Sequence, residues 1–246
     1  MSRVLLVLSL LAAMMLSVAG VATAQETATD VDVAAIAETA LAADPAALVT
    51  GLETPPDDAE LPEGFVNPPS GVSENADLVE QFTGAIGDID GAIGNVNHAF
   101  DTDPEVVPGL LSAGILTYIV TEEEITADAL DEFEEGASEG LDPATPAAAA
   151  TTDGATPPAA GPTTEGSVER VDLGGVEAVV VNVGVELGGV NAVVQIVAVP
   201  VGNTMVIGTV LVADQGEVDA DAVLAFAEDL TVAGVSHLGT VAEGAR

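Results

Sequence analysis

A run of valine, alanine and glycine at positions 174–199 constrains the fold of this chain more than any other feature. It reads GGVEAVVVNVGVELGGVNAVVQIVAV. Apolar residues recur at every second position, the period of a β-strand, giving one apolar face and one small, half-polar face. Glu186, Asn191 and Gln195 lie where a membrane-spanning helix would be apolar. The run therefore predicts the centre of an antiparallel sheet.

Short turns divide the rest of this sheet into further strands. Gly188-Gly189 and Gly202-Asn203 are typical of hairpin turns, and the strand TMVIGTVLV follows the second pair. Residues 92–100 and 110–120 have strand composition and are separated by an acidic loop. We therefore expect an antiparallel sheet of about five to six strands.

Two acidic segments predict helices beside this sheet. In 121–141, Thr126 is a suitable N-cap, and an apolar stripe follows it at helical spacing. The segment 214–234 has a similar stripe. The two stripes consist of Ala129, Leu130, Phe133 and Ala137, and of Val223, Phe226, Ala227 and Leu230. The fold class expected is α+β, an α/β/α sandwich in which helices flank the sheet.

The chain divides by composition into a leader, a helical segment and one larger domain. Residues 25–59 predict a helical segment followed by a Pro-rich loop, with Asp44 as N-cap and Pro45 at the first helical position. Residues 60–246 contain the sandwich. Within them, residues 141–166 are almost entirely Ala, Thr, Pro, Gly and Asp, which predicts a disordered insertion. Phe65, in the loop, is expected to anchor it to the core.

The first 24 residues have the three parts of a secretory signal peptide. Arg3 precedes an apolar stretch, and Ala22-Thr23-Ala24 forms a cleavage site. We expect cleavage after Ala24 and a secreted or extracytoplasmic protein with no integral membrane segment afterwards. The alternative is an uncleaved anchor, since positions 4–24 approach the ~20 apolar residues that span a bilayer.

Charge is the second strong constraint. The chain has 41 acidic and three basic residues, no lysine and a net charge of −38. Nucleic acid and anionic membrane surfaces are excluded as partners, because both require the opposite charge. The chain also has no cysteine, which excludes disulfides and thiolate metal sites. An exported, lysine-free acidic chain is typical of adaptation to concentrated salt.

The order of these elements resembles the PsbP-like α/β/α sandwich family, which includes exported lipoproteins of the LpqN type. The residues that suggest it are LPEGF at 61–65 and VDLGGVEAVVV at 171–181. This chain lacks the acylated cysteine of the lipoprotein relatives. The resemblance implies an accessory or binding module without catalytic machinery, and it transfers no functional residue.

The sequence offers little for catalysis. Ser236 and His237 are adjacent, but neighbours in sequence point apart, and no G-x-S-x-G motif is present. A hydrolase would have to use His237 or His98, the only histidines. No H-x-x-x-H pair that could bind zinc is present, and no Walker or Rossmann motif that could bind a nucleotide.

Calcium is the one cofactor for which the sequence offers candidate ligands. Asp88 and Asp90, and then Asp101, Asp103 and Glu105, bring oxygen ligands together on predicted loops. Neither group completes an EF-hand loop. The alternative interpretation is solvated acidic loops without a specific ion.

The sequence therefore predicts a secreted, non-catalytic accessory module that binds an unknown protein or an apolar ligand. A calcium-binding envelope protein is the first alternative, and a hydrolase of unknown class is the second.

Overall fold

The computed structural model describes residues 31–68, 91–109, 111–141, 163–187 and 190–246. The predicted signal peptide at 1–24 lies outside these ranges. The described elements, in chain order, are α2 (Val33–Ala42), α3 (Pro45–Leu52), β1 (Phe65–Val66), β2 (Ala92–Thr102), β3 (Leu111–Thr121), α5 (Ala127–Leu141), β4 (Thr163–Leu173), β5 (Val176–Leu187), β6 (Val190–Val201), β7 (Thr204–Asp214) and α6 (Ala220–Gly244).

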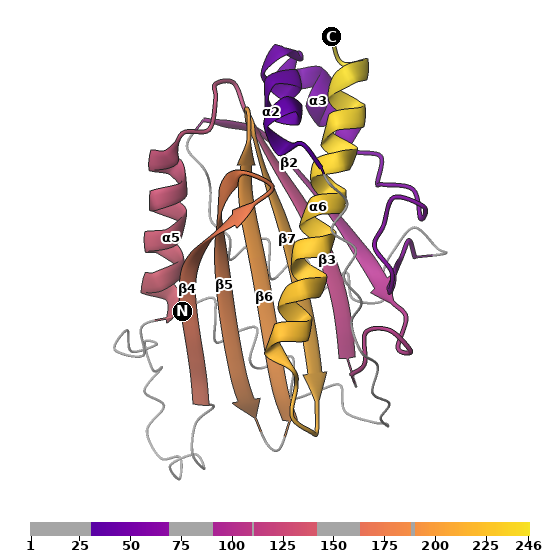
Figure 1. Ribbon diagram of the computed structural model, residues 1–246, viewed down its shortest axis with the longest axis vertical. Coiled ribbons are helices and arrows are strands. Elements are labelled where there is room, and N and C mark those ends of the chain that lie inside the picture. The colour runs from indigo at the N-terminus through magenta and orange to yellow at the C-terminus, as the bar shows by residue number, and fades with distance from the viewer. Residues whose placement is uncertain (1–30, 69–90, 110, 142–162, 188–189) are drawn as a thin grey trace, which may run out of the picture.

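One antiparallel sheet of seven strands organises the fold, in the order β1-β2-β3-β7-β6-β5-β4 (Figure 1). The predicted α+β class is confirmed, but the expected count of five to six strands was too low. The strands not predicted are the two-residue β1 and the edge strand β4. The predicted disordered insertion at 141–166 is wrong at both ends, because Leu141 ends α5 and residues 163–166 begin β4. Residues 142–162 lie outside the described residues. The composition of residues 163–166 is low in apolar residues, and they are held in the sheet by pairing with β5 along their whole length.

Tight turns join neighbouring strands in the second half of the sheet. Gly174 and Gly175 connect β4 to β5 and both have positive φ, at 63° and 85°, a conformation that glycine adopts without a steric penalty. Gly202, with φ 66°, turns β6 into β7 as predicted. The predicted turn at 188–189 lies outside the described residues. The residues on either side of it, Leu187 and Val190, are paired with each other.

Helices cover both faces of the sheet, and the alternation along each strand assigns residues to one layer or the other. Val180 and Val197 pack into the cluster with α2, α3 and α6, whereas Val179 and Ala198 pack into a second cluster with α5. In Figure 1, α6 crosses the sheet diagonally in front of β6 and β7, and α2 and α3 lie near its C-terminal end. Because both faces are buried, β5 and β6 need valine at successive positions.

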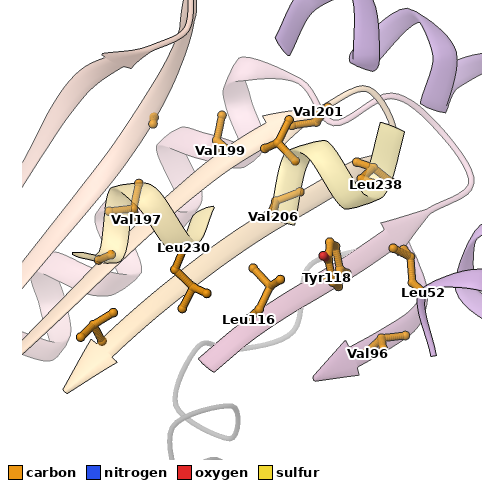
Figure 2. Packing of buried hydrophobic residues seen from close by; sticks show 14 of the residues in the cluster. Leu52, Val96, Leu116, Tyr118, Val197, Val199, Val201, Val206, Leu230 and Leu238 are labelled. Atoms are coloured by element: carbon orange, nitrogen blue, oxygen red, sulfur yellow. The ribbon is translucent and has the colours of Figure 1, made fainter. Parts of the chain in front are cut away.

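The larger apolar layer lies between α6 and the sheet. Leu116 and Tyr118 from β3, Val206 from β7 and Leu230 from α6 are fully buried there (Figure 2). The predicted stripe on α6 is confirmed, since Val223, Ala227 and Leu230 are buried and Phe226 packs against them. On the opposite face, the predicted α5 stripe of Ala129, Leu130, Phe133 and Ala137 is confirmed in the same way.

Helix α6 lies unusually close to β7 at Gly208. A Cβ built on Gly208 would lie 2.2 Å from Thr231 Oγ1 and 2.8 Å from the carbonyl oxygen of Ala227. Thr231 is itself fixed, because its single hydroxyl hydrogen is donated to the Ala227 carbonyl at 2.7 Å, with the Val197 carbonyl oxygen also within 3.4 Å. A residue without a side chain is therefore required at position 208.

One arginine fastens α5 to the sheet. Arg170 on β4 donates to Glu134 at 2.7 Å and to Asp131 on α5, and to Glu177 on β5 at 3.1 Å. Hydrogen bonds to Glu134 and Asp131 raise the pKa of the guanidinium above its ordinary value. In the ranges that the structure covers, Arg246 is the other arginine. Three of the many carboxylates thus share one cation.

Among the described helices, none is by itself long and apolar enough to cross a membrane. Helices α2 and α3 reach the required length only together, as a pair bent by 117°.

Candidate functional site

The two histidines of the chain and its single tyrosine come together in the core. His98 on β2, Tyr118 on β3 and His237 on α6 lie in one row, with ring centroids 6.2 Å apart for His98 and Tyr118 and 6.3 Å apart for Tyr118 and His237. Figure 2 shows Tyr118 on β3 and Leu52 at the end of α3, two members of the same apolar cluster. These residues, with Glu60, are called the histidine cluster below.

The strand and helix patterns explain why these side chains point inward. His98 has the same parity as Val96 and Phe100, both buried on the α6 side of β2. His237 lies seven residues after Leu230, two helical turns along the buried stripe of α6. Each polar ring thus occupies a position that the periodicity assigns to the core.

Main-chain carbonyl groups at the end of α3 bind both imidazoles. His98 Nε2 lies 2.8 Å from the carbonyl oxygen of Leu52, and His237 Nε2 lies 3.0 Å from that of Thr54. Because a carbonyl oxygen only accepts, each Nε2 carries a hydrogen and donates. The Tyr118 hydroxyl donates to the carbonyl of Gly234 at 3.2 Å. The three rings therefore connect β2, β3 and α6 with the end of α3.

A carboxylate completes the cluster from the loop between α3 and β1. Glu60 Oε2 lies 3.4 Å from His237 Nδ1 and accepts from the backbone N–H of Asp57 at 2.9 Å. His237 is 7% exposed, and its Nδ1 is buried without a hydrogen-bond partner.

Burial controls the protonation of the other members. Desolvation lowers the pKa of His98, the hydrogen bond to Leu52 opposes this, and the charge of His237 lowers it further. Burial first, and then the negative charge of Glu60, raise the pKa of Tyr118 well above 10. At neutral pH, His98 is therefore a neutral donor and Tyr118 keeps its proton. Neither is arranged as a catalytic base.

Ser236 and His237, which are adjacent in sequence, are not brought together as a nucleophile and base. The Ser236 hydroxyl donates to the carbonyl of Val232, one turn earlier in α6, at 3.0 Å. The ring nitrogens of His237 face Thr54 and Glu60 instead.

Of the candidate calcium ligands, the structure describes Asp101, Asp103 and Glu105. Asp101, expected on a loop, lies instead in β2 opposite Val66, one residue before the strand ends. Asp103 Oδ1 accepts from the backbone N–H of Glu105 at 2.9 Å in the turn that follows. Asp88 and Asp90 lie outside the described residues. Within the ranges given above, no group of three or more His, Cys, Asp or Glu side chains is placed to hold a metal ion.

Sequence reasoning missed the histidine cluster, although a signal for it existed. Both histidines fall on apolar stripes, a placement that indicates an inward-facing polar group needing a partner. Their partners could not have been found this way, because Glu60 and Thr54 lie in an irregular loop and the Leu52 carbonyl is at the very end of α3.

No protein-family model matches the chain, and no curated protein or solved structure matches it significantly. The similarity to the PsbP-like family therefore remains a prediction from sequence.

Proposed function

We propose that this protein is an extracytoplasmic, non-catalytic accessory or binding module whose acidic surface is an adaptation to concentrated salt. The observation that carries this proposal is the location of its carboxylates. In the described part of the chain, no Asp or Glu is among the buried side chains. Arg170 forms ion pairs with Asp131, Glu134 and Glu177.

Mobile cations must balance the net charge of −38 that the chain carries. At low ionic strength the like charges repel over ~30 Å, whereas at 1 M salt the Debye length falls to ~3 Å. Their repulsion then destabilises the folded state much less. Concentrated salt is therefore the condition in which such a surface is compatible with a stable fold.

The bonding of the histidine cluster supports the non-catalytic part of the proposal. Both Nε2 atoms donate to carbonyls of the protein itself, and the hydroxyls of Tyr118 and Ser236 donate to carbonyls within α6. These groups stabilise the packing of α3, β3 and α6. The binding partner, a protein or an apolar ligand, is proposed from the exported, non-catalytic character of the chain.

A turnover screen in molar NaCl tests this proposal against the hydrolase alternative. The substrates are aryl esters, a casein digest and aryl glycosides, and the variants are Ser236→Ala and His237→Gln. We expect no turnover above that of a heat-denatured sample. Turnover by the wild type that disappears in both variants, while circular dichroism shows them folded, would overturn the non-catalytic assignment.

A further inference from the structure

The unpaired nitrogen of His237 is the starting point of a further inference. Its Nε2 must donate to the carbonyl of Thr54, so in the neutral ring Nδ1 carries a lone pair. That lone pair is buried, and it faces an oxygen of Glu60 at 3.4 Å. An ionised carboxylate is also an acceptor. Two acceptors therefore face each other with no hydrogen between them.

One proton on Nδ1 resolves this mismatch. The imidazolium donates from Nε2 to Thr54 as before and gains a charge-assisted bond from Nδ1 to Glu60. The carboxylate is already held in place, because its Oε2 accepts from the N–H of Asp57. The Nδ1–Oε2 distance of 3.4 Å must shorten by roughly 0.5 Å to form a charge-assisted bond.

Glu60 belongs to a segment that covers the edge of the core. We call residues 53–67, which follow α3 and include β1, the strap. The strap is closed on itself, since the Asn67 side chain donates to the carbonyl of Pro56 at 2.8 Å and to Asp58 Oδ1 at 2.9 Å. As predicted, its Phe65 is an anchor: it is 3% exposed and packs edge-to-face on Phe226 of α6 at 6.3 Å.

We propose that a proton shared between His237 and Glu60 fastens the strap to α6, so that the strap is held more tightly in mild acid than in alkaline solution. The groups that face His237 within the described residues are Glu60 on the strap, Tyr118 on β3 and His98 on β2. The Tyr118 hydroxyl stays protonated, and His98 resists a second positive charge. A charge on His237 therefore disfavours a second charge on His98.

Hydrogen exchange of the strap amides tests this directly. Protection factors for residues 53–67, corrected for the intrinsic rate at each pH, are measured by mass spectrometry on the full chain between pH 8 and pH 6. Sodium chloride is held at 2 M throughout (~2 Å Debye length), so that surface repulsion stays screened. Gaining a charge-assisted hydrogen bond should raise strap protection roughly tenfold over this range.

Two variants separate the proposed bond from a general effect of charge. Glu60→Gln removes the carboxylate, but its amide can donate to the neutral Nδ1, so strap protection should become independent of pH. Glu63→Gln is the matched control, since it makes the same change of charge at an exposed position in the same strap and should retain the wild-type response. Because Glu60 is 37% exposed at its side chain, both variants are expected to fold.

A second measurement reads the proton itself. With only two histidines in the chain, ¹⁵N labelling gives two sets of ring signals, assigned with His98→Gln. We expect the His237 Nδ1 signal to shift to that of a protonated nitrogen on acidification while Nε2 stays protonated. The proposal is overturned if strap protection in Glu60→Gln rises with acid as in the wild type. It is equally overturned if the wild type shows no rise, or if Nδ1 stays unprotonated at pH 6.

Discussion

Gly208→Ala is the substitution for which the structure gives the clearest expected cost. The new Cβ would lie 2.2 Å from Thr231 Oγ1, 2.8 Å from the carbonyl oxygen of Ala227 and 3.0 Å from the backbone N of Thr231. Two of these three atoms belong to the backbone of α6, so no side-chain rotation can relieve the contact. The helix must move away from β7, and the hydroxyl bonds of Thr231 are disturbed.

The expected destabilisation is about 1–3 kcal/mol, the range for inserting a methyl group into a packed core. For a domain of this size, each kcal/mol shifts the unfolding midpoint by roughly 2–4 °C, so a decrease of about 2–12 °C is expected. The assay is thermal unfolding in 2 M NaCl, followed by far-ultraviolet circular dichroism because the chain has no tryptophan.

Gly136→Ala is the matched control. Gly136 lies within α5, and a Cβ there would have nothing within 4 Å. Alanine in an exposed helix interior is favoured over glycine by roughly 0.5–1 kcal/mol, so this variant should unfold at a slightly higher temperature. The packing account of α6 on β7 would be refuted if Gly208→Ala were as stable as Gly136→Ala.

Three further predictions concern charge. Arg170→Gln should increase proteolysis within α5 more than elsewhere, because Asp131 and Glu134 lose their shared cation, and molar salt should reduce the difference from wild type. Folding lowers the pKa of His98, so below about pH 6.5 the unfolded chain takes up a proton on this residue before the folded chain does. The free energy of unfolding of the wild type should therefore fall toward that of His98→Gln as the pH is lowered through this range, measured by chemical denaturation. Burial and the charge of Asp229 raise the pKa of Glu228, so the ionised form of this side chain destabilises the folded state. Glu228→Gln should therefore raise the thermal unfolding midpoint at pH 7. It should have no effect at pH 3, where Glu228 is protonated in both the folded and the unfolded chain.

The regular elements could be predicted from sequence because their physics is local. The alternation in β5 and β6 and the stripes of α5 and α6 follow from side-chain periodicity alone. The N-cap of α3 was also predicted correctly, because Asp44 accepts a hydrogen bond from the backbone N–H of Ala47 at 2.9 Å. Each of these features depends on residues within a few positions of one another.

The parts that sequence reasoning missed depend on distant partners. Residues 163–166 look unstructured by composition, and they form a strand because β5 lies beside them. In the sequence Arg170 has no evident partner, whereas in the folded protein α5 brings Asp131 and Glu134 into ion pairs with it. The histidine cluster likewise joins β2, β3, α6 and a Pro-rich loop, and no local sequence pattern indicates that these four segments come into contact.

The most direct test of the proposed function is the unfolding midpoint measured from 0.01 to 4 M NaCl, with CaCl₂ and MgCl₂ compared at equal ionic strength in low salt. The account predicts a midpoint that rises continuously with NaCl, as screening of the carboxylates increases. It also predicts the same midpoint in calcium and magnesium. A midpoint independent of NaCl would contradict the salt adaptation. A rise at millimolar calcium that magnesium does not reproduce would instead favour the calcium-binding alternative, since ligand at 100 times its Kd stabilises by about 2.7 kcal/mol.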